Sequence, residues 1–194
     1  YVTRPCIILD GMRVSGLSQA DYIVIDPLPK ELNGTEFNIT ISIRFIFAYI
    51  GQFSWSVILR RHAFSLNKYG YALVYDLVED QRKFIFVWCY SDGWSAVTTG
   101  SVDPYQWHSI RLEYSESKSR VAIYLNNNLE REETSITPYN KTKGEYLLIE
   151  PLSSASRGSI AISELIIETP TTTFSLKPEY FNGTHFIDPE GHVW

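Results

Sequence analysis

The chain has 194 residues, of which 44% are hydrophobic and 20% are charged, and its net charge at pH 7 is −5. This composition is that of a globular protein long enough to bury a sizeable core of its own. Lys and Arg are scattered singly rather than grouped in a basic stripe, so we expect no nucleic-acid partner. No apolar run approaches the roughly 18 residues that a membrane-spanning helix needs.

Alternation of apolar and polar residues dominates the chain. The longest run, residues 38–50, has one face made of Ile39, Ile41, Ile43, Phe45, Phe47 and Tyr49. This period of two predicts a long, half-buried strand. Further strand-like runs occur at residues 6–10, 21–26, 55–61, 71–77, 83–91, 94–99, 107–114, 119–127, 145–150 and 159–168. No window combines a helical period with helix caps, so we expect an all-β fold of roughly eleven strands in a two-sheet antiparallel sandwich or jelly roll.

The composition changes after Glu168, where the sequence TPTTT resembles an extended linker. The segment beyond it carries the aromatic residues Phe174, Tyr180, Phe181, Phe186 and Trp194. So many aromatic side chains are not typical of a free tail. We therefore expect residues 1–168 to form the sandwich. Residues 169–194 should pack back onto it, or onto a neighbouring subunit if the protein assembles.

Four Asn-X-Thr triplets, which are acceptors for N-glycosylation, indicate the compartment. Their asparagines are Asn33, Asn38, Asn140 and Asn182, half of the eight Asn residues in the chain. This is more than the Asn, Ser and Thr content leads one to expect, although coincidence without glycosylation is the alternative. The excess favours a secreted or surface-exposed glycoprotein, and a first residue Tyr1 in place of Met suits a mature or excised chain.

The two cysteines fit the same setting. In an oxidising compartment, Cys6 and Cys89 can form a single disulfide, which would tie the N-terminal strand to a mid-chain strand. Two buried thiols without a disulfide are the alternative interpretation.

Residues 92–130 carry a recognisable order of elements. A turn and a Trp-His pair lead into an alternating strand, SIRLEY, which is followed by a tight turn, a second alternating strand, RVAIYL, and an Asn-rich hairpin. This order resembles the core of the laminin-G and concanavalin-A-like superfamily. The resemblance covers about residues 7–168, and GSIAISELIIE at residues 158–168 is similar to the closing strand of that family. It implies a two-sheet antiparallel jelly roll.

The Trp-His pair has a structural interpretation. Strand alternation places Trp107, Ser109, Arg111 and Glu113 on one face, and His108, Ile110, Leu112 and Tyr114 on the other. The second set is mostly apolar and should face the core between the sheets. We expect His108 to lie at the sandwich edge and to hydrogen-bond a loop carbonyl, while Trp107 covers the start of the strand. A catalytic His would need a nucleophile or carboxylate partner, for which no motif is found.

Paired carboxylates are the signature that a glycoside hydrolase on this fold would need. The nearest match is Glu130 with Glu132, which could share a strand face. However, Arg131 and Glu133 make the run charged on both faces, as on a solvent-exposed strand. We therefore expect no enzymatic activity.

Calcium is the one cofactor that relatives of this fold suggest, because many of them hold it at a sheet rim through carboxylates and carbonyls. The candidate ligands are Asp10, Asp21, Asp26 and Asp92, which are dispersed along the chain. The acidic residue of the family's closing strand is matched by Glu164, but Ser163 stands where some bacterial relatives have Asp. The resemblance therefore leaves a metal site open.

Sugar binding needs exposed aromatic rings with polar groups beside them. One predicted hairpin offers Trp88, Tyr90, Asp92 and Trp94, and the run before it offers Tyr69 and Tyr71. Because Trp88 and Tyr90 share a strand face opposite Val87 and Cys89, and one of these faces must be core, about half of the aromatic residues serve packing. Trp94, next to the turn, is the best candidate for exposure.

These observations favour an extracellular recognition module, lectin-like or adhesive, whose partner is a glycan or a surface protein. A structural subunit of a filament, surface layer or virion coat is the alternative, with the aromatic tail or an exposed strand edge making the contact between subunits. A glycoside hydrolase is the second alternative, because the fold permits it.

Overall fold

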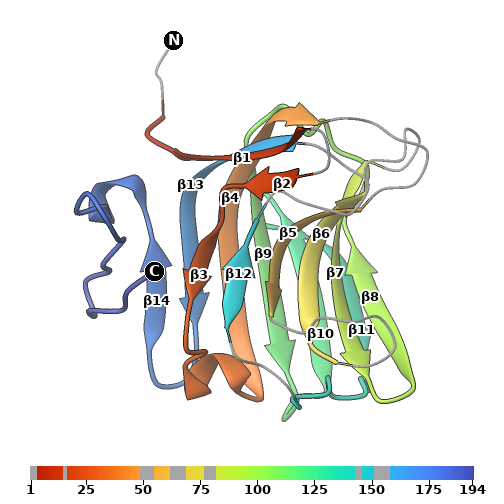
Figure 1. The fold of residues 1–194 in the computed structure, drawn as a ribbon. Coiled ribbons are helices and arrows are strands. Elements are labelled where there is room, and N and C mark those ends of the chain that lie inside the picture. Colours follow the sequence, from red (N-terminus) through yellow and green to blue (C-terminus); the bar gives the residue numbers. More distant parts are fainter. Residues whose placement is uncertain are drawn as a thin grey trace.

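The computed structural model describes residues 4–14, 17–48, 55–61, 69–76, 82–142, 146–150 and 158–194. Within these ranges the strands form two antiparallel sheets that pack face to face as a sandwich (Figure 1). The first sheet has the order β11 (Asn128–Thr134), β10 (Arg120–Leu125), β9 (His108–Ser115), β4 (Glu36–Ala48), β13 (Gly158–Glu168), β1 (Ile7–Val14) and β2 (Leu17–Ala20), and β14 (Thr173–Leu176) also pairs with β13.

The second sheet has the order β3 (Ile23–Ile25), β12 (Leu147–Ile149), β5 (Trp55–Arg61), β6 (Tyr71–Asp76), β7 (Lys83–Tyr90) and β8 (Gly93–Thr98). Two short 3-10 turns, η1 (Lys30–Asn33) and η2 (Pro178–Tyr180), are the helical elements of the described ranges. The predicted all-β sandwich is thus confirmed. No helix among the described residues is long and apolar enough to cross a membrane.

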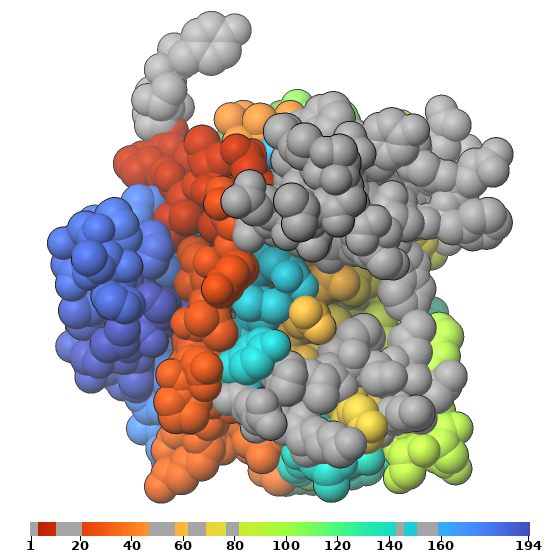
Figure 2. Space-filling view, viewed as in Figure 1, coloured from red at the N-terminus to blue at the C-terminus, as the bar shows by residue number. Residues whose placement is uncertain are grey.

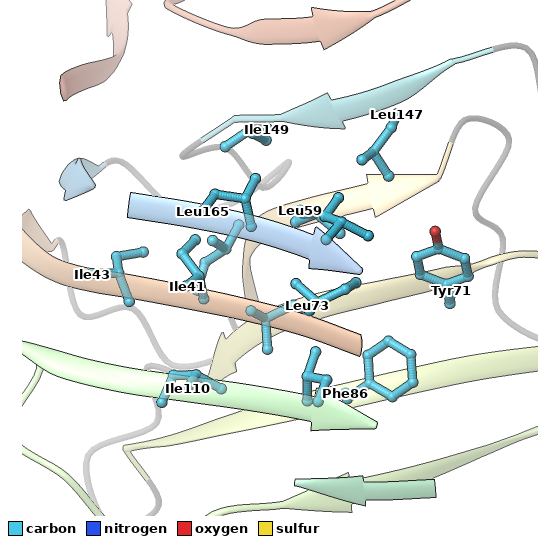
Figure 3. Close-up of a cluster of buried hydrophobic side chains, with 14 of the residues drawn as sticks. Ile41, Ile43, Leu59, Tyr71, Leu73, Phe86, Ile110, Leu147, Ile149 and Leu165 are labelled. Carbon is cyan, nitrogen blue, oxygen red and sulfur yellow. The ribbon is translucent and has the colours of Figure 1, made fainter. Parts of the chain in front are cut away.

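Strand β4 is the centre of the first sheet, because it pairs with β9 along one edge and with β13 along the other. Its alternation sends one apolar face inward, and the side chains of Ile39, Ile41, Ile43 and Phe45 are buried as predicted. Phe47 has only its backbone described, and Tyr49 lies outside the described residues. Figure 3 shows this inner layer facing the side chains of the second sheet.

Strand β13 completes the inner layer with the help of a β-bulge. Its register against β4 shifts between Ile162 and Glu164, so that Ser163 is an extra residue in the strand. Both Ile162 and Leu165 can therefore point into the core although they are three positions apart, and both are fully buried. A bulge of this kind redirects the side chains around it. Here Ser163 and Glu164 lie on the outer side of the sheet.

The second sheet is buried on both faces at its centre. Tyr71, Tyr75, Phe84, Phe86 and Trp88 belong to the core between the sheets. The alternating residues of the same strands form a second buried cluster on the other face, consisting of Ala72, Val74, Ile85, Val87 and Cys89. Alternation therefore divides these strands into two apolar faces instead of one apolar and one polar face.

The predicted disulfide is not formed. Cys6 and Cys89, both within the described residues, are not joined to each other. Cys6 precedes β1 in the first sheet, whereas Cys89 is buried in the cluster on the outer face of the second sheet. The alternative of two buried thiols without a disulfide therefore holds for Cys89, which is buried, whereas Cys6 is only half-buried.

The C-terminal segment is part of the sandwich. The expected linker is a tight hairpin turn, in which Thr169 Oγ1 accepts from Thr172 N at 3.1 Å and Thr169 N donates to Thr172 O at 2.9 Å. Beyond the turn, β14 pairs with residues 165–168 of β13, on the same edge of that strand where β1 pairs with residues 158–162. Phe174, Leu176 and Trp194 are buried in the main core, and the segment forms a compact body against the side of the sandwich (Figure 2).

One buried carboxylate holds this segment together. Asp188 Oδ2 accepts from Ser175 N at 2.9 Å and from His192 Nδ1 at 2.8 Å, and Oδ1 accepts from the backbone N–H groups of Glu190 and His192. Burial opposes ionisation, but the hydrogen bonds from His192 and from the backbone outweigh it and lower the pKa of Asp188 below its ordinary value.

Replacement of Asp188 by Asn should therefore destabilise the protein. Asp188→Asn replaces one of the two accepting oxygens by an NH₂ group, which cannot accept a hydrogen bond from a backbone N–H. We expect a loss of about 1–3 kcal/mol in the free energy of unfolding at pH 7. Because the folded pKa lies below the unfolded one, the wild-type advantage should disappear as the pH falls below about 4. Urea unfolding between pH 2.5 and pH 7 measures this difference, with the exposed Glu179→Gln as the matched control; equal stability of both variants at pH 7 would contradict the assignment.

Candidate functional site

A groove with a volume of about 570 Å³ lies on the outer face of the first sheet. Its floor comes from neighbouring strands, because Ser42 in β4 pairs with Ser109 in β9 and with Glu164 in β13. Ser42 and Ser109 face outward, since the next residues in their strands, Ile43 and Ile110, are buried in the core, and the bulge at Ser163 leaves Glu164 on the same outer side. Three hydrogen-bonded strands thus present a row of polar side chains.

An indole ring forms one wall of the groove. Trp107 directly precedes β9 and is half-buried. The guanidinium carbon of Arg4 lies 5.3 Å from the ring centroid, and that of Arg44 lies 5.4 Å from it. Cations at this distance from an indole ring are attracted by its π electrons. Arg4 Nη1 also donates to Ser42 Oγ at 2.9 Å and to Ser163 Oγ at 3.5 Å, so it bridges the wall and the floor.

The remaining walls are polar as well. Lys177 Nζ lies 2.7 Å from Glu164 Oε1, and this hydrogen bond raises the pKa of Lys177 above its ordinary value. On the far side, Asn126 sits in the β10–β11 turn with a φ of 50°, and its Oδ1 accepts from Ser109 N at 3.0 Å. An amide held by its oxygen in this way still has its NH₂ group as a donor. The groove therefore combines charged, hydroxyl and amide groups around one aromatic ring.

His108 has the structural role that strand alternation predicted. Its Nε2 donates to the Asp103 carbonyl at 2.7 Å, and its ring meets the edge of Phe84 in the opposite sheet. The same loop is held from both sheets, because Phe45 N of β4 donates to Pro104 O and Tyr75 Oη of β6 donates to Val102 O. His108 thus helps to fix the loop that enters β9, whereas the neighbours of the Trp107 ring are Arg4 and Arg44.

The hairpin of β7 and β8 does not bring the predicted binding residues together on one surface. Trp88 is only 1% exposed, and its Nε1 donates to Thr137 O, so it belongs to the core. Tyr90 is half-buried, packs against Gly93 and donates to Trp94 O at 3.3 Å. Asp92 and Trp94 are exposed, Trp94 by 43%. Of the two upstream tyrosines, Tyr71 is in the core.

The carboxylate pair considered for hydrolysis does not converge. Glu130 Oε2 accepts from Gly100 N at 2.8 Å, in the loop after β8, whereas Glu132 Oε2 forms an ion pair with Arg120 Nη2 at 2.8 Å. The register of β10 and β11 shifts between Ile123 and Tyr124, which interrupts the alternation that would have put both glutamates on one face. Their different partners do not make the arrangement of a glycosidase.

The four aspartates considered for calcium are also not grouped. Asp21 Oδ2 accepts from Asp10 N at 3.1 Å, which joins these two residues at the end of the first sheet. Asp26 lies before a cis-proline bond to Pro27, and Asp92 lies in the turn between β7 and β8. In the part of the chain that the structure describes, no three His, Cys, Asp or Glu residues form a cluster that could hold a metal ion.

The four sequon asparagines differ in their surroundings. Asn140 and Asn182 each fold into a local turn in which the Thr of the sequon donates to the Asn oxygen. Asn33 Oδ1 accepts from the buried Arg61 at 2.7 Å, and Asn38 is exposed in β4. Asn140 and Asn182 thus share a turn geometry in which the Thr of the sequon binds the Asn side chain.

No protein-family model matches the sequence, and no curated protein matches it either. Solved structures do share the fold. The botulinum neurotoxin serotype D binding domain superposes with a TM-score of 0.59 at 10% identity, over 86% of this chain and 44% of that chain. The binding domain of botulinum neurotoxin DC, in complex with rat synaptotagmin II, gives 0.58 at 11% identity, over 84% of this chain and 43% of that chain.

A botulinum neurotoxin type C structure, described with cell entry that depends on two ganglioside molecules, gives a TM-score of 0.57 at 13% identity, over 84% of this chain and 39% of that chain. This chain spans less than half of the length of each of these neurotoxin chains. At such low identity the similarity shows the fold alone: a β-sandwich of the jelly-roll type that also occurs in binding domains.

The role of His108 in fixing the groove loop can be tested by substitution. His108→Ala removes the donor to Asp103 O and should lower the free energy of unfolding by about 1–3 kcal/mol. His108→Gln should recover part of this loss, because its amide can donate to the same carbonyl. Urea unfolding measures both variants beside the exposed control Ser101→Ala. Wild-type stability of His108→Ala would show that the loop is held without this hydrogen bond.

Proposed function

We propose that this chain is an extracellular, N-glycosylated recognition module of the laminin-G and concanavalin-A-like type, and that the groove beside Trp107 binds a carbohydrate. The observation that carries the proposal is the combination of an indole wall with Arg4 and a floor of serine hydroxyls on paired strands. Sugars are bound by aromatic rings together with a few fixed polar groups. A site on rigid strands keeps its geometry before the ligand arrives.

The mixed charge of the groove also suits a neutral or weakly acidic sugar. Arg4 supplies positive charge in the groove, Arg44 lies behind it against the Trp107 ring, and Glu164 is paired with Lys177. Hydroxyl groups of a sugar can accept from Arg4 and from the Asn126 amide and donate to carboxylate or serine oxygens. The neurotoxin domains that share the fold are binding domains, which supports recognition as the general function, although their ligands are their own.

Catalysis has less support. Glu130 and Glu132, the best carboxylate pair that the sequence offered, are held by different partners. The surface location and the glycosylation rest on the four sequons, two of which adopt exposed or half-exposed turns.

Assembly into a filament or coat is the alternative function. Phe174 and Trp194 are buried in the core of the same chain and are not available to a neighbour, whereas Phe181, Ile187 and Val193 of the same segment are exposed. The edge strand β11 carries exposed charged residues in the run Glu130–Glu133. Charged side chains on an edge strand oppose the addition of another strand. These observations favour recognition over assembly.

A glycan array, probed with protein secreted from a glycosylating host, tests the proposal. We expect binding to a restricted class of glycans, and a loss of about tenfold or more in affinity for Trp107→Ala and for Arg4→Ala, equivalent to about 1.4 kcal/mol. Trp94→Ala, on the opposite sheet, is the matched control and should bind like the wild type.

Thermal unfolding of each variant separates lost binding from lost folding. A blank array across all glycan classes would count against a lectin-like function. Loss of binding in Trp94→Ala with full binding in Arg4→Ala would instead move the site to the β7–β8 hairpin.

A further inference from the structure

The sequon at Asn182 is held in a defined geometry by its own loop. Asn182 Oδ1 accepts three hydrogen bonds: from Thr184 N at 3.0 Å, from Thr184 Oγ1 at 3.0 Å and from His185 N at 2.9 Å. Gly183, with a φ of 102°, allows the chain to turn this tightly. Because the oxygen of the planar amide is directed into the turn, Nδ2 on the opposite branch is directed away from it, and the residue is exposed.

The residue that precedes Asn182 in the chain is aromatic and exposed. Phe181 directly precedes Asn182 and is 51% exposed, an unusual position for a Phe side chain. Its ring centroid lies 4.9 Å from that of Phe186, with which it pairs across the short hairpin. Phe186 in turn packs against the main core. One side of the Phe181 ring is thus supported by the protein, while the other side is left to solvent.

We propose that Asn182 carries an N-linked glycan and that its first N-acetylglucosamine covers the exposed face of Phe181. The C–H groups on one face of a pyranose ring pack on an aromatic ring, which removes apolar surface from water. The sugar would thereby stabilise the hairpin of residues 181–194, whose last residue, Trp194, is buried in the core. This inference rests on passage through the secretory pathway, as in the proposed function, but not on carbohydrate binding in the groove.

The modification is an ordinary glycosyl transfer. A bond forms between Asn182 Nδ2 and the anomeric carbon of the sugar, and the bond between that carbon and the pyrophosphate oxygen of a lipid-linked oligosaccharide breaks. The pyrophosphate keeps the electron pair of the broken bond, and the amide loses one proton.

Asn140 provides a matched control within the same chain. Its oxygen accepts from Thr142 N at 3.0 Å and from Thr142 Oγ1 at 2.7 Å, so the turn resembles that at Asn182. The residue before it is also aromatic, but Tyr139 is only 2% exposed and donates to Gly34 O. A glycan at Asn140 therefore has no exposed ring at the preceding position to cover.

The test is a thermal double-mutant cycle on the full chain secreted from a host that makes high-mannose glycans, trimmed enzymatically to a single N-acetylglucosamine. Mass spectrometry of glycopeptides should find Asn182 occupied. Asn182→Gln removes the glycan and also the hydrogen bonds of the turn, and the second loss is common to both backgrounds. The decrease in Tm should therefore be larger by about 2–4 °C in the wild-type background than in the Phe181→Ala background. Asn140→Gln should change Tm by the same amount in both backgrounds.

A second variant keeps the test valid if Phe181→Ala does not fold. Phe181→Leu retains an apolar side chain against Phe186 but has no aromatic face, so it should reduce the effect of Asn182→Gln by the same amount as Phe181→Ala. An unoccupied Asn182, or an equal decrease in Tm with and without Phe181, would overturn the proposal. A blank glycan array would leave this result unaffected, so the two proposals fail separately.

Discussion

The alternation of β4 is the constraint on which the rest of the structure depends. This strand is paired on both edges, so its backbone groups are satisfied by β9 and β13 and its side chains are free to serve two different surfaces. The inward residues Ile39, Ile41 and Ile43 form the centre of the core. The outward residue Ser42 forms part of the floor of the groove, and Arg44 lies against the Trp107 ring that forms its wall. Stability and recognition thus come from opposite faces of one strand.

The groove is completed by segments that are distant in the sequence. Arg4 precedes the first strand, Trp107 lies mid-chain and Lys177 follows β14. The bulge at Ser163 brings a hydroxyl within 3.5 Å of Arg4, while Ile162 and Leu165 of the same strand stay in the core. The C-terminal segment, which contributes Lys177 to the groove, is anchored to the sandwich by buried side chains and by the hydrogen bonds of Asp188.

Much of this architecture could be predicted from local patterns. The period of two identified the strands, the inward face of β4 and the hydrogen bond of His108 to a loop carbonyl, because each depends on neighbouring residues. Alternation could not show that both faces of β7 are buried, or that the face with Trp88 is the one in the core between the sheets. It also could not detect the bulge that separates Glu130 from Glu132, or the groove itself, which exists only once non-consecutive strands have paired.

Hydrogen–deuterium exchange with and without the glycan that binds most strongly is the most direct measurement of the central claim. If the outer face of the first sheet is the recognition surface, the ligand should slow exchange in segments around Ser42, Trp107 and Ser163, and leave the β7–β8 turn unchanged. Protection confined to the turn that holds Asp92 and Trp94, with no change across the first sheet, would contradict the account.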